Sequence, residues 1–338
     1  MATYKNIKGT NVQSIAGDPP SPVKGQIWYN STARVLKGEV LADATWASGG
    51  ALPAARQSIP SCGTQTSALA AGGFATGSSP PVGNVKADAY EYDGSSWTAG
   101  GTMGTAQYLG AAVGTQTAAF VAAGRVYTPT VAAKPATEEY NGSSWTAGGA
   151  LSTARYNAAQ GGTLTAGFVA GGQSSPSDAF TNTEEYDGSS FSAGGALTAA
   201  RAGLSGTGTQ TAGLAFTGHT PGNPTTYVST TDEYNGSSWT AGGAVNQSGK
   251  FRAGFGIQTA AVGAGGYNST NLTATELYDG TSWTTNSNSL PKATNNISNS
   301  GLGTQTAGLV VGGGNPNPTT DTLEFNGAAP ATVTIDVD

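Results

Sequence analysis

One motif recurs along the chain, and its spacing limits the possible folds more than any other feature does. In its clearest copy, residues 139–155, Glu-Tyr-Asn-Gly-Ser-Ser-Trp is followed by Thr-Ala-Gly-Gly-Ala-Leu-Ser-Thr-Ala-Arg. The aromatic residue of the motif recurs at steps of 44 to 51 residues, as Trp46, Trp97, Trp145, Phe191, Trp239 and Trp283. A repeat of this length indicates a β-propeller or a solenoid.

Each repeat divides into four expected strands. Strand A is expected around the arginine (201–205 in one repeat), and strand B in the apolar run after a Gly-Thr-Gln segment (212–216). Strand C is Glu-Glu-Tyr, and strand D begins at the aromatic residue. The Asp-Gly or Asn-Gly pair between C and D favours a tight hairpin turn. The Gly-Gly pairs argue against helices. Six turns before strand B, four of them Gly-Thr-Gln and two of them variants at Gly162 and Gly256, therefore predict an all-β, six-bladed propeller.

The two ends of the chain do not follow the repeat. We expect residues 1–45 to form a docking or closure segment with a hairpin over 25–37, and residues 46–338 to form the propeller. Residues 39–46 have the pattern of a degenerate copy of the motif. Because an open sheet edge promotes aggregation, the ring is expected to close by pairing between the chain ends. Either the Trp46 segment or a strand at 331–338 could complete the last blade.

The repeat resembles that of the Kelch family, which has an arginine on strand A, Gly-Gly after strand B, and a Tyr and a Trp flanking the C–D hairpin. In the first repeat these residues are Arg56, Gly72-Gly73, Tyr92 and Trp97. The resemblance covers roughly residues 46–330 and implies a Kelch-like β-propeller. The spacing from Tyr to Trp is shorter than in typical Kelch repeats, and two repeats have Ala-Gly or Thr-Gly in place of Gly-Gly.

The near-identical, Gly/Thr/Ala-rich sequences of the repeats also resemble those of Kelch-type proteins of tailed bacteriophages, and residues 17–30 resemble the leader of phage tail-associated proteins. This resemblance implies a virion structural protein, tail-associated or surface-decorating. Other virion proteins would bind its N-terminal segment, and the propeller would face a host-surface glycan or protein. The first eight residues lack the apolar core of a secretory signal, so we expect release by cell lysis.

Composition argues against several functions. The formal net charge is -6 and the few Lys and Arg residues are scattered, which argues against nucleic-acid binding. No apolar run is long enough for membrane insertion. The single cysteine, Cys62, and the single histidine, His219, argue against a disulfide framework and against Cys/His metal sites. We expect no cofactor and no metal; the copper oxidases among Kelch propellers need a histidine pair.

No catalytic signature is present, so a non-enzymatic role is expected. An envelope-degrading enzyme remains an alternative, because two glycosidase carboxylates on separate loops leave no local pattern. The Asp-Gly-Ser-Ser segments are interpreted as turns, since one carboxylate per turn is too few for calcium.

The first candidate ligand-binding residues are the repeated arginines. Equivalent positions in a propeller form a ring near its axis, where cations could hold an anionic sugar or a carboxylate. The candidates are Arg56, Arg155, Arg201 and Arg252, with Gln107, Lys250 and Lys292 at or near the same place in other repeats. The other interpretation is structural, with each arginine packing its stem and hydrogen-bonding loop carbonyls.

The second candidates are the loops between strands B and C, which vary most in length and carry isolated aromatic residues, Tyr127, Phe180, Tyr227 and Tyr267. Variable loops on a rigid scaffold are common recognition sites, although neutral variation of surface loops is the alternative. Aromatic rings beside amides and hydroxyls suit a carbohydrate or a protein, so a lectin-like module is the second expected function.

Overall fold

The computed structural model describes residues 12–20, 26–41, 43–75, 84–127, 131–297, 302–314, 317–328 and 330–335. Within these ranges every regular element is a β-strand, and no helix is long and apolar enough to cross a membrane. The chain separates into two compact units, Met1–Ala44 with Gly327–Asp338, and Thr45–Asn326. We describe each unit by itself.

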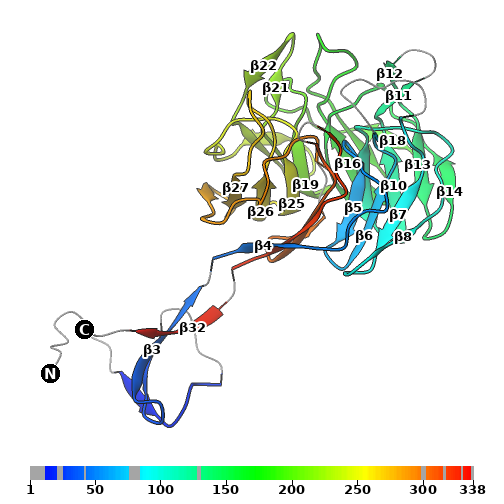
Figure 1. Cartoon of the computed structure of the whole chain (residues 1–338). Coiled ribbons are helices and arrows are strands. Elements are labelled where there is room, and N and C mark those ends of the chain that lie inside the picture. The colour runs from blue at the N-terminus through cyan, green and yellow to red at the C-terminus, as the bar shows by residue number, and fades with distance from the viewer. Residues whose placement is uncertain are drawn as a thin grey trace. The chain divides into compact units, whose positions relative to one another are not determined.

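The smaller unit contains one four-stranded sheet in the order β1–β2–β3–β32 (Figure 1). Its strands are β1 (Gln13–Ile15), β2 (Ile27–Asn30), β3 (Val35–Leu41) and β32 (Pro330–Ile335). Strands β2 and β3 form a hairpin, and β32 pairs antiparallel with β3. The indole of Trp28 is fully buried and donates to Asp18 Oδ1 over 3.1 Å, and Lys37 Nζ lies 2.7 Å from Asp18 Oδ2.

This sheet differs from the expected boundaries in two ways. Residues 39–46 are not a copy of the repeat motif, because Glu39 lies in β3 opposite Thr332. The physical reason is that this stretch has Ala-Asp-Ala where the motif has Asp-Gly, so it lacks the glycine that lets the chain reverse. The C-terminal strand also pairs here and does not complete a sheet of the repeats.

The described part of the larger unit contains six four-stranded antiparallel sheets, numbered here in chain order. Sheet 1 has β5 (Ser61–Thr64), β6 (Ser67–Ala71), β7 (Ala89–Tyr92) and β8 (Trp97–Ala99). Sheet 2 has β9 (Ala111–Thr115), β10 (Ala118–Ala122), β13 (Thr137–Tyr140) and β14 (Trp145–Gly148). Sheet 3 has β15 (Ala159–Thr163), β16 (Ala166–Ala170), β17 (Thr183–Tyr186) and β18 (Phe191–Ala193).

The remaining sheets follow the same plan, and two of the six sheets carry an extra hairpin. Sheet 4 has β19 (Ser205–Thr209), β20 (Ala212–Phe216), β23 (Thr231–Tyr234) and β24 (Trp239–Ala241). Sheet 5 has β25 (Ala253–Ile257), β26 (Ala260–Ala264), β27 (Thr275–Tyr278) and β28 (Trp283–Thr285). Sheet 6 has β29 (Gly303–Thr304), β30 (Ala307–Val311), β31 (Thr322–Asn326) and β4 (Thr45–Ser48). The hairpins are β11 (Arg125–Tyr127) with β12 (Val131–Ala133), and β21 (His219–Thr220) with β22 (Asn223–Tyr227).

Sheet 6 is completed by the N-terminal side of the chain. Strand β4 pairs with β31, placing Trp46 opposite Phe325, so of the two segments that could complete the last sheet, the Trp46 segment does so. The first strand of each sheet contacts the first strand of the next, and β29 of sheet 6 also contacts β5 of sheet 1. The contacts between first strands therefore run in order from sheet 1 to sheet 6 and return to sheet 1.

The first strand of each repeat begins later than expected. In sheet 4 it covers Ser205–Thr209, where residues 201–205 were expected. The Gly-Thr pair belongs to the strand, and the two residues that follow it form the turn. Arg201 therefore precedes the strand, and its guanidinium pairs with Asp232.

Consecutive sheets are joined by hydrogen bonds between the Tyr, Glu and Gly residues that recur in the motif. The Tyr140 hydroxyl of sheet 2 donates to Glu91 of sheet 1 over 2.6 Å and accepts the N–H of Gly101 over 3.3 Å. The equivalent Tyr–Glu bonds join Tyr92 to Glu324, Tyr186 to Glu139, Tyr234 to Glu185 and Tyr278 to Glu233. The bond from Tyr92 to Glu324 links sheet 1 to sheet 6.

The motif also has a Gly-Gly pair after strand D, and the close approach of the neighbouring sheet requires its second glycine. A Cβ atom on Gly50 would lie 2.1 Å from the backbone oxygen of Ser95 on the neighbouring sheet, so no larger residue fits there. Sheets 5 and 6 meet differently: Phe325 stands where the other sheets have Tyr, Leu277 stands where they have Glu, and residues 286–287 are Asn-Ser where they have Gly-Gly. The three departures belong together, because a phenylalanine has no hydroxyl for the glutamate or the glycine to bind.

Candidate functional site

The repeated arginines point inward and are bound within the protein. Arg155 pairs with Glu184 at 2.6 Å, Arg201 with Asp232 at 2.7 Å and Arg252 with Glu276 at 2.8 Å; the side chains of all six residues are at most 4% exposed. Arg56 pairs with Asp88 at 2.6 Å. These guanidinium groups are therefore not presented to a ligand. Removing one partner of such a buried pair costs about 3–5 kcal/mol.

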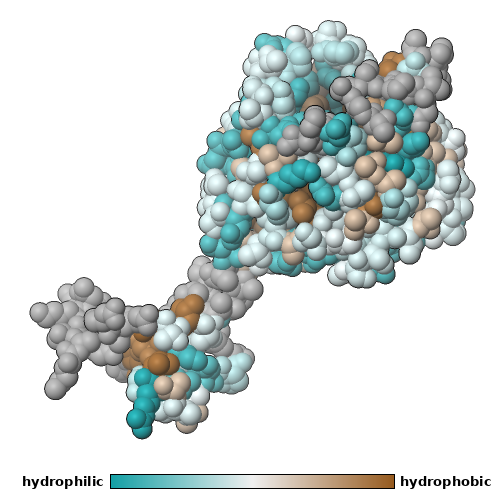
Figure 2. Space-filling model, in the orientation of Figure 1, coloured by the Kyte–Doolittle hydropathy of each residue, from teal (hydrophilic) through white to brown (hydrophobic). Residues whose placement is uncertain are grey.

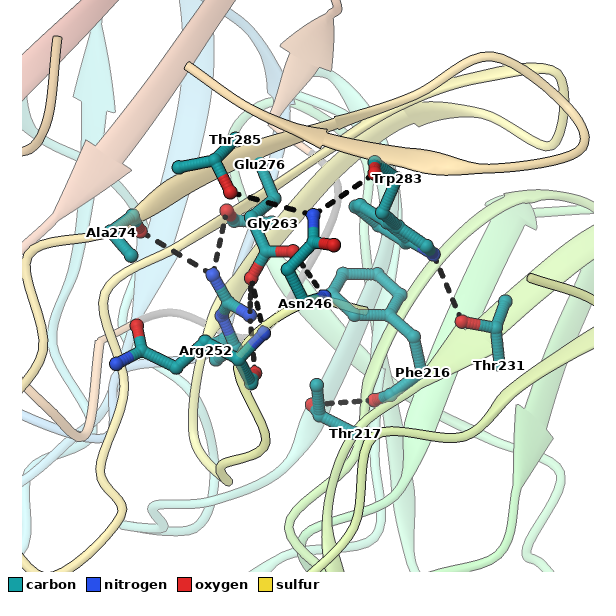
Figure 3. Close-up of polar contacts among 11 residues, drawn as sticks. Phe216, Thr217, Thr231, Asn246, Arg252, Gly263, Ala274, Glu276, Trp283 and Thr285 are labelled. Atoms are coloured by element: carbon teal, nitrogen blue, oxygen red, sulfur yellow. Dashed lines mark hydrogen bonds and ion pairs between the residues drawn. The ribbon is translucent and has the colours of Figure 1, made fainter. Parts of the chain in front are cut away.

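Arg252 keeps this ion pair although it stands three residues further along its repeat. The Lys250–Tyr267 bridge in sheet 5 corresponds to the Ala202–His219 bridge in sheet 4, so Gly249 occupies the position of Arg201. Figure 3 shows the Arg252 guanidinium bonded to Glu276 and to backbone oxygens, including that of Gly263 at 3.1 Å. Burial lowers the pKa of Arg252, and Glu276 opposes that shift. Lys250 takes no part in this ion pair, and its side chain lies beside Tyr227 and Tyr267 of the loops.

Six bridged pairs of residues join the segment before each first strand to the loop after each second strand. We call this set the loop-face ring. It consists of Gln57–Phe74, Tyr108–Arg125, Tyr156–Gln173, Ala202–His219, Lys250–Tyr267 and Asn295–Gly314. Each pair is one antiparallel bridge, and each sheet contributes one pair. The loop-face ring therefore gathers residues from all six repeats on one side of the larger unit.

The residue after the first member of each pair forms an inner chain of hydrogen bonds. The N–H of Leu109 donates to Ser58 O over 3.0 Å, Asn157 N donates to Leu109 O over 3.2 Å, and Gly203 N donates to Asn157 O over 2.9 Å. Phe251 N donates to Gly203 O, and Ser58 N donates to the oxygen of Asn296. The non-glycine members have positive φ, for example 58° at Leu109 and 57° at Phe251. Such conformations cost about 1–3 kcal/mol each and gather at functional sites.

Two of the four candidate aromatic residues meet at a lysine of the loop-face ring. The Tyr227 and Tyr267 rings lie 6.0 Å apart and nearly perpendicular. Lys250 Nζ lies 5.6 Å from the centre of the Tyr227 ring, 5.9 Å from that of Tyr267 and 5.0 Å from that of Phe251. The lysine donates one hydrogen bond, to Pro224 O over 2.9 Å. Burial lowers the pKa of Lys250.

The other two candidates lie elsewhere. Phe180 lies 5.4 Å below the guanidinium carbon of Arg155, so it covers the ion pair of sheet 3. Tyr127 packs against the buried cluster of Phe74, Val85 and Tyr108. The structure does not bring Tyr127 or Phe180 to the Lys250 cluster.

The loop-face ring contains two cationic residues, Arg125 and Lys250. From the sequence, Lys250 was named only as a residue near the position of the repeated arginines, and Arg125 was not named. The Arg125 guanidinium carbon lies 4.6 Å from the centre of the Tyr156 ring and 5.9 Å from that of Tyr108. Within the described ranges, neither Arg125 nor Lys250 has a carboxylate partner. A signal was present in the sequence: Arg125 follows the glycine after strand B, where the other repeats have Phe, Gln, His, Tyr or Gly.

Among the described residues, three buried polar atoms on neutral side chains of the loop-face ring and its inner chain lack a hydrogen-bond partner. They are Asn157 Oδ1, Gln173 Oε1 and His219 Nδ1, on side chains of residues that are 3%, 6% and 3% exposed. His219 Nδ1 lies next to Gly203 of the inner chain, 3.2 Å from where a Cβ atom would stand. Burial, and secondarily the Lys250 ammonium, lowers the pKa of His219 to about 4. The imidazole is therefore neutral at pH 7.

The remaining chemistry-bearing residues have structural surroundings. Cys62 borders a cavity of about 180 Å³ between the first strands of the sheets, and burial raises the pKa of its thiol to about 12, so it is not a thiolate at neutral pH. Asp93 accepts the N–H groups of Ser95 and Ser96, which lower its pKa to about 2. Among the residues that the structure describes, no three His, Cys, Asp or Glu side chains group so as to hold a metal ion.

Comparison with known proteins bears on the fold. No family model and no curated protein sequence matches the chain. The solved structure of YjhT is similar, with a TM-score of 0.68 over 84% of this chain and 99% of that one, at 12% sequence identity. The fold is propeller-like. At this identity the likeness concerns the fold alone, and it fits the order of four-stranded sheets found in the larger unit.

Proposed function

We propose that the larger unit is a six-bladed Kelch-like β-propeller and that the protein is a non-enzymatic recognition component of a bacteriophage virion. The observation that carries the recognition role is the loop-face ring, where all six repeats contribute residues to one surface on a rigid scaffold. The ring-like order of strand contacts and the Tyr92–Glu324 bond support a closed propeller. The resemblance of residues 17–30 to phage leaders supports the placement in a virion.

In this proposal the smaller unit attaches the propeller to other virion proteins. Both ends of the larger unit lead into it, and its sheet joins a strand from before the repeats, β3, to one from after them, β32. Two covalent connections would hold the propeller on the particle more firmly than a single flexible tail would. The ligand would be a glycan or protein of the host surface, and a lectin-like role in glycan binding is the form that the aromatic and amide side chains of the ring favour.

Labelling of particles tests the proposal. Antibody to the purified protein, with immunogold electron microscopy of lysates from the source culture, should label the tail or the capsid surface. Label at the tail tip would support host recognition, and label over the capsid would support surface decoration. Purified particles without the protein, or label confined to uninfected cells, would refute the virion placement.

A further inference from the structure

The loop-face ring contains two cations that have no counter-charge. Arg125 has five N–H donors, yet no described residue accepts a hydrogen bond from its side chain, and its Nε is buried without an acceptor. Lys250 uses one of three donors, on Pro224 O. In contrast, Arg155, Arg201 and Arg252 each have a carboxylate within 2.8 Å. The acid of the loop after strand β16, Asp178, is bonded to Ser174 and Ser175 instead.

A half-buried cation without a partner is costly unless an anion completes it. The aromatic rings around Arg125 and Lys250 offset part of this cost through cation–π contacts. They do not neutralise the charges, because an aromatic ring carries none. An anionic ligand would give these two cations the negatively charged partner that the protein itself provides for the repeated arginines.

The neutral groups beside the cations point to the rest of the ligand. Asn157 Oδ1 and Gln173 Oε1 are acceptors on nine-tenths buried side chains without a donor, so hydroxyl groups would satisfy them. The half-buried rings of Tyr227 and Tyr267 offer an apolar face with a polar tip. In the view of Figure 2, hydrophobic residues are scattered over the larger unit and form no broad patch. Hydroxyls, ring faces and negative charge together describe an acidic carbohydrate.

The two cations come from different repeats, which favours a ligand with more than one carboxylate. Arg125 belongs to sheet 2 and Lys250 to sheet 5, three steps apart in the circular order of six sheets. Their backbones therefore belong to different members of the loop-face ring, with the Arg125 guanidinium beside Tyr156 of the third repeat and the Lys250 ammonium beside Tyr227 of the fourth. A chain with a repeating carboxylate can pair with the two cations at once.

We propose that the loop-face ring binds an acidic polysaccharide of the cell envelope, with Arg125 and Lys250 pairing with its carboxylates and Asn157 and Gln173 accepting from its hydroxyls. This inference rests on the proposed recognition function and names the ligand class of the same surface. It predicts binding that weakens as salt increases, since the cations are partly exposed.

The test uses uronate-containing bacterial polysaccharides, each immobilised in native form and after chemical reduction of its carboxyl groups to alcohols, and a phosphate-bearing envelope polymer as a third arm. Binding of the full chain is measured by biolayer interferometry. We expect binding to native uronate polymers that falls roughly ten-fold or more on reduction, the loss of a charge-assisted bond. Arg125→Gln and Lys250→Gln should each weaken binding by a similar factor.

A matched control removes the same charge elsewhere. Arg34→Gln, at an exposed residue of the smaller unit, should bind as the parent does. Unchanged binding to reduced polymers, equal binding by the ring variants and the control, or no binding to any polymer would each overturn the inference. Stronger binding to the phosphate polymer would overturn the carboxylate assignment. Particle labelling is independent of all these results, so the virion proposal stands or falls separately.

Discussion

Phe191 stands where five of the six sheets have tryptophan, and this difference leaves a defect that can be repaired. In four sheets the indole N–H donates to a threonine hydroxyl of the preceding sheet, over 2.9 Å for Trp97 and Thr322 and 2.8 Å for Trp239 and Thr183. Trp283 and Trp46 make the same bond to Thr231 and Thr275. Phe191 has no N–H, and the threonine it faces, Thr137, is 2% exposed with an Oγ1 that has no partner.

The Phe191→Trp substitution should therefore stabilise the larger unit. A new hydrogen bond contributes about 0.5–1.5 kcal/mol net, and satisfying a buried hydroxyl removes a penalty of about 1–3 kcal/mol. Fitting the larger ring between Tyr186 and Phe120, whose centroids lie 4.5 and 6.0 Å from that of Phe191, offsets part of this gain. We expect a net gain of about 1–2 kcal/mol, which for a unit of this size raises Tm by roughly 2–8 °C.

Thermal unfolding by differential scanning calorimetry measures the effect, and a double-mutant cycle assigns its cause. In a Thr137→Val background the gain from Phe191→Trp should shrink by about 1 kcal/mol, because the acceptor is gone. Thr137→Val alone should be close to neutral, whereas the matched Thr183→Val should cost about 1–3 kcal/mol by leaving the Trp239 N–H unsatisfied. A tryptophan effect that is the same with and without the Thr137 hydroxyl would refute the reasoning. So would equal costs for the two valine substitutions.

Three further predictions follow from single features of the fold. A chain limited to residues 45–326 keeps β4, so removing residues 45–48 as well should lower its Tm by more than about 10 °C, since the contacts of the half-buried Trp46 and the pairing of β4 with β31 are both lost; equal Tm values would show that β4 does not complete sheet 6. Five repeats have a glutamine in the turn after the first strand that donates to two backbone carbonyls of the preceding sheet, as Gln116 does to Ala68 and Tyr92; Leu164→Gln should add such bonds and raise stability in urea by about 1 kcal/mol, and a loss would mean that the apolar contacts of Leu164 outweigh them. Because burial lowers the pKa of His219 from 6.5 to about 4, the unfolded chain takes up the proton first, so the stability present above pH 6.5 is lost as the pH falls towards 4. His219→Gln should flatten that part of the stability profile, and an unchanged slope would contradict the neutral imidazole.

The sequence determined the repeating architecture because short-range signals, the turn pairs and the strand patterns beside them, recur in each repeat. An Asp-Gly or Asn-Gly pair forces a tight reversal, and the alternating residues around it can only be strands, so the C–D hairpins were predictable from residues such as Asp187 and Phe191. The coupled changes at Leu277 and Phe325 are also visible in the sequence, although their meaning requires knowing that Glu and Tyr meet across sheets. The lack of a glycine in residues 39–46 was a local signal too, and it explains why that stretch does not form a hairpin.

The tertiary structure alone decided which side chains face inward. Arg252 and Lys250 are two residues apart and chemically similar in sequence, yet one is buried against Glu276 and the other lies among the rings of Tyr227 and Tyr267. The choice depends on the position of a carboxylate 24 residues away in the chain, which no local pattern encodes. The same holds for the segment that completes sheet 6, where β4 and β32 are both β-prone. Local propensity is shared by many segments, whereas pairing depends on partners that only folding brings together.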